Sequence, residues 1–203
     1  MGVRAIRATS ALLMSVWLQQ CAAGEVRLER GAWPEAMACE ACVNFQFGEL
    51  AMRLPLRLIG RFFVAGSEAS AVHLLAPGAA NGKNSAVFLS TTRAAYIGKY
   101  QALGLPSVNA MGGEAFFDLL GEPAQRDSPF HAIRRIEGID AAEHYLKTSK
   151  GRLHAYWVQT APDTSQYLHL VVDGSDTIYT VAGTITSQLY GALLGGMTSE
   201  PQP

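Results

Sequence analysis

Two cysteines separated by two residues form the pair with the clearest chemical potential. Cys39-Glu40-Ala41-Cys42 can alternate between a dithiol and a disulfide, because four residues close a small ring. A redox-active first cysteine usually lies at a helix N-terminus, where the helix dipole favours its thiolate. We expect a short helix to begin at Pro34, which places both cysteines in its last turn, where the dipole opposes a thiolate. The spacing therefore predicts a structural disulfide, with a thiol-redox pair as the alternative.

Five histidines are the other candidates for metal binding or catalysis. No two of them lie three or four residues apart, and no HExxH motif occurs. A zinc or copper site built on His154 and His169 needs a third ligand, for which Asp173 or Asp176 is the evident source. Histidines on the polar face of a sheet are far more common than such sites. We therefore expect no metal site and no cofactor.

An alternating pattern predicts a hairpin near the C-terminal end of the chain. Its strands are Arg152–Gln159 and Gln166–Val172, with a turn centred between Pro162 and Asp163. Successive side chains of a strand point to opposite faces of its sheet, so each strand has one apolar side and one side with histidine and tyrosine.

The histidine and tyrosine side of this hairpin is the candidate binding face. The expected register sets His154 opposite Val171 and Tyr156 opposite His169, so the two histidines are diagonal neighbours. Exposed aromatic rings beside histidines suit a contact surface better than a core. The face comprises His154, Tyr156, Tyr167 and His169.

No motif assigns a catalytic activity. The GxSxG elbow of serine hydrolases and the glycine-rich nucleotide motifs GxGxxG and GxxxxGK[ST] are absent. Serine, histidine and aspartate occur as residue types, but no local context aligns them. Catalytic residues therefore remain unassigned. The leading hypothesis is a non-catalytic binding or interaction domain, and the alternative is an envelope enzyme, either a hydrolase or a thiol-redox protein using Cys39 and Cys42.

The N-terminus has the order of a secretory signal peptide. Arg4 and Arg7 form a basic region, Ala8–Leu18 form an apolar segment, and polar and small residues follow. The apolar segment is too short to cross a bilayer comfortably. Cleavage after Ala23 leaves a mature chain that begins at Gly24, so residues 1–23 are the predicted signal peptide.

A bacterial lipoprotein is the alternative to soluble export. Leu18 lies three residues before Cys21, as in a lipobox, whereas Gln20 departs from the small residue normally found before a lipidated cysteine. We expect a periplasmic or secreted protein, with membrane attachment through Cys21 as the alternative. Removal of residues 1–23 leaves two of the three cysteines, an even number, as an oxidising compartment favours.

Composition limits the class of protein and its partners. The 203 residues are 49% hydrophobic and 16% charged, with a net charge of -1, which suits a folded core and excludes disorder over most of the chain. The balanced charge argues against a nucleic-acid partner held by phosphate contacts. Beyond the N-terminal segment no apolar stretch approaches membrane length, which excludes a multispanning transporter. The expected partner is an envelope protein or a small ligand.

The remaining patterns predict one domain at residues 33–197, between a linker at 24–32 and a disordered tail at 198–203. Short strands are expected across residues 43–65, followed by a hairpin at 71–75 and 85–89. Helices are expected after Thr92 up to Leu103, at residues 113–120 and 140–147, and from Thr186 or Ser187 to Met197.

These elements predict an α+β fold. A mostly antiparallel sheet carries helices on one face, and a C-terminal meander precedes an amphipathic helix. The closing hairpin and helix are similar to those of PsbP-like sandwich proteins, a topological analogy that implies no function. The strings IRRIEGID (Ile133–Asp140) and KGRLHAYW (Lys150–Trp157) resemble segments of uncharacterised exported bacterial proteins, which likewise implies no activity.

Overall fold

The computed structural model describes residues 25–65, 71–77, 85–105, 111–162 and 164–199. The predicted signal peptide, Cys21 and the Asp163 position of the hairpin turn lie outside these ranges. The described strands and helices are, in chain order, β1 (Leu28–Gly31), β2 (Cys42–Phe47), β3 (Leu50–Pro55), β4 (Arg61–Ala65), β5 (Ala71–Leu75), β6 (Ser85–Thr92), α1 (Arg93–Gly98), α2 (Gly113–Leu120), α3 (Pro129–Ile136), β7 (His144–Lys150), β8 (Leu153–Gln159), β9 (Gln166–Val172), β10 (Thr177–Gly183), α4 (Ser187–Gly195) and β11 (Met197–Ser199).

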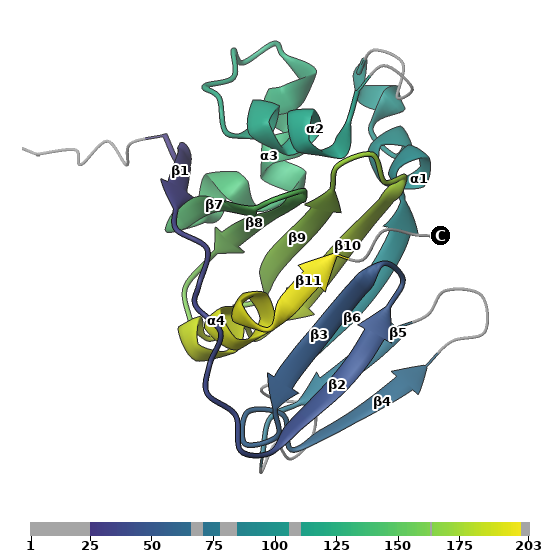
Figure 1. Ribbon diagram of the computed structural model, residues 1–203. Coiled ribbons are helices and arrows are strands. Elements are labelled where there is room, and N and C mark those ends of the chain that lie inside the picture. The colour runs from purple at the N-terminus through teal and green to yellow at the C-terminus, as the bar shows by residue number, and fades with distance from the viewer. Residues whose placement is uncertain (1–24, 66–70, 78–84, 106–110, 163, 200–203) are drawn as a thin grey trace, which may run out of the picture.

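The described strands form two sheets (Figure 1). The larger has the strand order β1-β7-β8-β9-β10-β6-β5-β4, and the smaller has the order β11-β3-β2. Among the described strands, β1 and β7 pair in parallel and the other neighbours pair antiparallel. The predicted α+β class with a mostly antiparallel sheet is confirmed. No helix in the described ranges has both the length and the apolar character needed to span a bilayer.

The predicted hairpin of β8 and β9 has the expected register. His154 lies opposite Val171, and Tyr156 lies opposite His169. Because strand side chains alternate, Leu153, Ala155 and Trp157 on β8 face one core, whereas Tyr156 and Val158 face another.

Both faces of the large sheet are covered, so the molecule has three layers (Figure 1). On one face, α4 and the small sheet enclose a core that includes Phe88, Leu170 and Val181. On the other, α1, α2 and α3 enclose a core that includes Phe117 and Tyr145. The sheet is therefore the middle layer, and side chains on either of its faces are candidates for burial.

The helix expected from Pro34 is absent, because residues 32–39 are irregular and Cys42 already opens β2. Tertiary contacts override the helix propensity of this segment. The indole Nε1 of Trp33 donates to the Leu194 carbonyl at 2.9 Å, and the backbone of Glu35 lies against Gly195. The segment is thus held as an extended strap along α4.

The helix expected at residues 140–147 is also wrong. A single 3₁₀ turn occupies Ile139–Ala141, and β7 follows. The local capping pattern is outweighed by pairing with β8, which buries Tyr145 and Lys147 on one side of the strand. A helix that the patterns missed, α3, precedes it, and the side chain of Ser128 caps its N-terminus.

The other predicted helices are confirmed at α2 and α4, whereas the helix after Thr92 ends at Gly98 and is followed by a 3₁₀ turn at Gln101–Leu103. The edges of the expected domain also shift. The predicted linker contains β1, which pairs with β7, and the predicted tail begins within β11, which pairs with β3.

Candidate functional site

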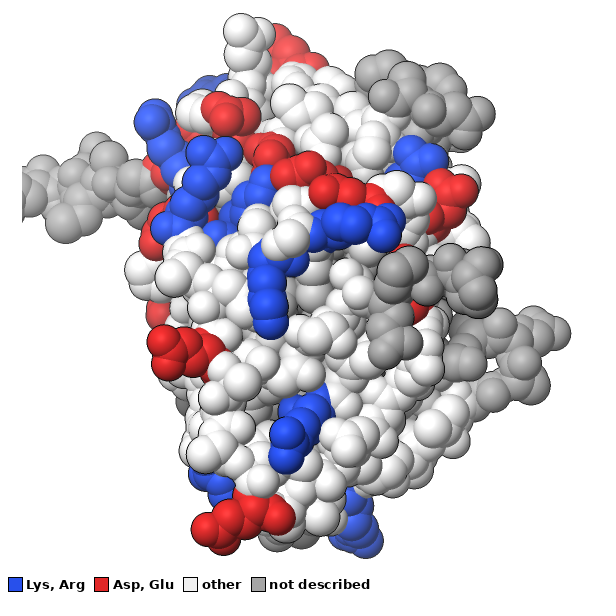
Figure 2. All heavy atoms as spheres, in the orientation of Figure 1, with Lys and Arg blue, Asp and Glu red and all other residues white. Residues whose placement is uncertain are grey.

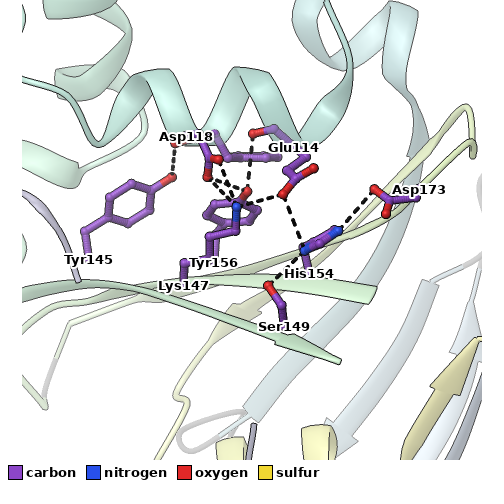
Figure 3. Close-up of polar contacts among 9 residues, drawn as sticks. Glu114, Asp118, Tyr145, Lys147, Ser149, His154, Tyr156 and Asp173 are labelled. Carbon is purple, nitrogen blue, oxygen red and sulfur yellow. Dashed lines mark hydrogen bonds and ion pairs between the residues drawn. The ribbon is translucent and has the colours of Figure 1, made fainter. Parts of the chain in front are cut away.

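Helix α2 presents two carboxylates to the large sheet. Phe116, Phe117 and Leu120 are fully buried and fix the helix against the sheet. Glu114 and Asp118 are four residues apart, so both project from the same side of the helix, over β7 and β8 (Figure 3).

A buried lysine holds these carboxylates. The Nζ of Lys147 on β7 lies 2.8 Å from Glu114 Oε1 and 2.8 Å from both carboxylate oxygens of Asp118. The hydroxyl of Tyr156 on β8 donates to Asp118 Oδ1 at 2.7 Å, and burial together with this carboxylate raises the pKa of Tyr156. These contacts tie α2 to the sheet and leave Glu114 as the carboxylate nearer to the edge of the cluster.

His154 lies beside Glu114 at this edge, with partners on both ring nitrogens (Figure 3). Its Nδ1 is 2.9 Å from Ser149 Oγ and 3.6 Å from Glu114 Oε1, and its Nε2 is 3.1 Å from Asp173 Oδ1. The side chain of His154 is 10% exposed, whereas those of Glu114 and Asp173 are 40% and 48% exposed. The imidazole is thus the buried part of the site, and the two half-exposed carboxylates lie between it and the solvent.

Glu114, His154 and Asp173 have the composition of a metal site. One ligand atom from each lies within 4.8 Å of the other two. Imidazole with carboxylates suits zinc and neighbouring divalent transition metals. Asp173 approaches Nε2, whereas Glu114 approaches Nδ1, so a cation bound at Nε2 would need the half-exposed side chain of Glu114 to turn toward it. Ser149 would then orient the ring through Nδ1, as outer-sphere partners of metal-bound histidines commonly do.

The charge balance also favours a cation. Glu114, Asp118 and Asp173 supply carboxylates, and Lys147 is the ammonium in contact with two of them. The guanidinium of Arg152 donates to the backbone carbonyl of Asp173, so a second cationic side chain lies at this end of the site and three carboxylates face two cations. A divalent cation at His154 would offset the excess negative charge.

A cavity of about 320 Å³ adjoins the cluster. Its wall includes both carboxylate ligands, but neither His154 nor Ser149. It leaves room for water or a small ligand to complete a coordination shell that three protein groups leave open. The lining residues are Arg93, Gly112–Ala115 and Val171–Asp176.

Ser149, His154 and Asp173 also form a chain with the distances of a nucleophile, base and acid. Two observations favour metal binding over a serine nucleophile. Glu114 approaches the same ring nitrogen as Ser149, and the adjoining cavity meets the two carboxylates rather than the hydroxyl.

The face predicted to be exposed is largely covered. His154, Tyr156 and His169 are 8%, 0% and 2% exposed, and only Tyr167 reaches 36%. Phe117 of α2 stacks on Tyr156 and His169, with ring centroids 5.1 Å and 4.7 Å apart. The expectation of an open contact surface was wrong, because the helices bury these rings, while the Tyr156 hydroxyl and both ring nitrogens of His154 have polar partners.

His169 belongs to a separate, buried polar group. Its Nε2 is 3.4 Å from Glu137 Oε2, and the hydroxyls of Tyr96 and Tyr100 donate to the same carboxylate. Lys99 Nζ lies 3.0 Å from Glu137 Oε1. Burial raises the pKa of Glu137, but His169, Lys99 and Tyr96 outweigh it and lower that pKa from 4.5 to about 2. The group joins α1, the end of α3 and β9.

Of the two aspartates considered as a third ligand, Asp173 does reach His154, whereas Asp176 pairs with Arg93 at 2.7 Å. Sequence patterns missed Glu114 and Ser149. Glu114 lies in a correctly predicted helix, but nothing in its spacing connects it to a strand 40 residues later. Ser149 lies in the strand that was predicted partly as helix.

The predicted pairing of Cys39 with Cys42 is confirmed as a disulfide between the end of the strap and the start of β2. Cys39 also lines a cavity of about 390 Å³ at the protein surface. Elsewhere on the surface, Figure 2 shows acidic and basic side chains interspersed beside the helical layer, and a mostly uncharged area over β2 and β3.

Comparison with protein-family models and with curated proteins gives no relative. The chain matches no model of a protein family, and no curated protein matches it. The resemblance to exported bacterial proteins and the analogy to PsbP-like sandwiches therefore stay predictions.

Proposed function

We propose that the mature chain is a non-catalytic binding domain of the cell envelope whose ligand is a divalent transition-metal cation. Export rests on the basic, apolar and small-residue order of residues 1–23, with lipidation at Cys21 as the alternative route to the envelope. Metal binding rests on the cluster of Glu114, His154 and Asp173.

The placement of His154 between two carboxylates is the observation that carries the proposal. The carboxylates approach from α2 and from the turn after β9, so three separate elements supply the ligands. His154 is held from the side by Ser149, which reduces the ordering needed when a cation binds. Zinc is the expected cation, because it accepts imidazole and carboxylate ligands in a four-coordinate site with one position open.

Isothermal titration calorimetry tests this on the untagged mature chain, after treatment with a chelator and its removal by dialysis. We expect one zinc ion per chain. Glu114→Gln, His154→Gln and Asp173→Asn should each weaken binding by at least about tenfold, since each removes a ligand. Asp176→Asn is the matched control, because it lies in the same turn as Asp173 but pairs with Arg93.

The control should keep the affinity of the unaltered chain. If the unaltered chain binds neither zinc nor manganese, or if the three ligand variants bind as tightly as Asp176→Asn, the proposed site is wrong. Circular dichroism of each variant confirms that any loss of binding does not come from unfolding.

A further inference from the structure

The Cys39–Cys42 disulfide contributes little to holding its part of the chain in place. It closes a ring with a sequence separation of 3, and the entropy that a crosslink removes from the unfolded chain is smallest for short rings. The strap has other anchors. Trp33 and Met37 pack against the core, and the Leu56 amide donates to the Ala41 carbonyl at 2.9 Å. As a purely structural crosslink, this disulfide would therefore add little to the stability of the fold.

The disulfide is accessible from solvent. Both cysteines are only partly buried, and the intervening Glu40 and Ala41 are exposed. Cys39 lines the cavity of about 390 Å³ that also includes Pro55 and Arg57, whereas Cys42 does not. A thiolate entering the cavity thus meets Cys39 first.

No helix dipole opposes a thiolate at Cys39, because residues 32–39 form no helix. Arg57, which is exposed, lines the same cavity as Cys39. A nearby cation favours the thiolate form of a cysteine. Glu40 is the acidic residue of this cavity, so the local charge is balanced rather than negative.

We propose that Cys39 and Cys42 form a thiol–disulfide exchange site that oxidises dithiols of reduced protein segments. A substrate thiolate attacks Cys39 Sγ, the Cys39–Cys42 bond breaks, and Cys42 leaves as a thiolate. The second thiolate of the substrate then attacks the substrate sulfur of the mixed disulfide, and Cys39 leaves as a thiolate. The substrate becomes a disulfide, both cysteines become thiols, and the two protons of the substrate dithiol end on them. This activity is independent of the metal site.

The first test compares exchange rates of the oxidised mature chain with dithiothreitol, in the folded state and in urea, by alkylation and mass spectrometry. We expect the folded chain to react at least ten times faster than the unfolded chain. A ratio below ten, or unfolding of the chain on reduction, would overturn the proposal and leave a structural bond.

The second test separates the roles of the two cysteines. The reduced Cys42→Ser variant should accumulate a mixed disulfide with a synthetic peptide whose two cysteines form a disulfide. The Cys39→Ser variant should form at least ten times less of this mixed disulfide, because Cys42 does not line the cavity. Arg57→Gln should slow formation severalfold, and Arg61→Gln is its control. Equal trapping by the two cysteine variants would contradict the assignment of Cys39.

Discussion

Glu137 and His169 lie 3.4 Å apart across the boundary between the helical layer and the large sheet, and their side chains are 7% and 2% exposed. Glu137 follows α3 directly and His169 lies in the middle of β9, so the contact joins segments that are distant in the chain. Tyr96 and Tyr100 of α1 donate to the same carboxylate. This buried group therefore couples three elements through one ionised side chain.

Acid should destabilise the protein through Glu137. Its pKa is about 2 in the folded state, below the ordinary value of 4.5. Its contribution to the free energy of unfolding is thus fully present above pH 4.5 and is lost as the pH falls toward 2. We expect Glu137→Gln to cost about 2–3 kcal/mol at pH 7 and to reduce the acid dependence between these values. Urea unfolding at pH 7, 4 and 3 measures the loss in the free energy of unfolding and its dependence on pH.

Glu122→Gln is the control for this series, because Glu122 is exposed. It should leave the free energy of unfolding within about 0.5 kcal/mol of the unaltered chain at each pH. If the free energy of unfolding of Glu137→Gln falls with pH as steeply as that of the unaltered chain, other groups cause the destabilisation in acid.

Lys147 should be important for the stability of the fold. Its side chain is 8% exposed, and its ammonium contacts Glu114 and Asp118, whose side chains are 40% and 34% exposed. Lys147→Met leaves both carboxylates without this partner, but solvent screens them partly. We expect a loss of about 1–3 kcal/mol in the free energy of unfolding. Lys150→Met on the exposed end of the same strand is the control, and an equal effect of the two would refute the assigned role.

The hairpin of β8 and β9 was predictable because its signals are local. Alternation identified both strands, and the turn residues between them set the register. β7 was not predictable in the same way. The local pattern after Asp140 indicates a helix start, whereas the strand is specified by pairing with β8 and by contacts of Tyr145 and Lys147 with α2. The local pattern of apolar and polar residues carries no information on such tertiary contacts.

The candidate site shows the same limit. Alternation correctly set His154 and Tyr156 on one face of the sheet, but it carries no information on what covers that face. Phe117 of α2 covers it, and the same helix brings Glu114 to His154. The absence of a close histidine pair argued against a metal site, yet tertiary structure brings Glu114, His154 and Asp173 together.

Arg134 should hold the N-terminal segment to the helical layer. It is 1% exposed, and its guanidinium donates to the carbonyls of Val26 and Leu120 and to Asp140. Arg134→Met leaves the buried Leu120 carbonyl, and the partly buried Val26 carbonyl and Asp140 carboxylate, without this partner, and we expect a loss of about 3–5 kcal/mol. Hydrogen exchange should accelerate first in β1. The neighbouring Arg135 is exposed, so Arg135→Met should change neither. Unchanged protection of β1 in Arg134→Met would contradict this role.

Ser149 should tune metal affinity without being essential for it. Its hydroxyl lies 2.9 Å from His154 Nδ1 and is not among the three ligands, so Ser149→Ala removes the group that orients the ring. We expect zinc to bind about tenfold more weakly with unchanged stoichiometry, since outer-sphere partners typically contribute 10–100-fold. Binding should weaken in acid for both chains, because a protonated imidazole cannot coordinate. Ser165→Ala, an exposed serine outside the site, should bind as the unaltered chain does. If Ser149→Ala abolishes binding, the hydroxyl is itself a ligand; if it has no effect, Ser149 does not orient the ring for metal binding.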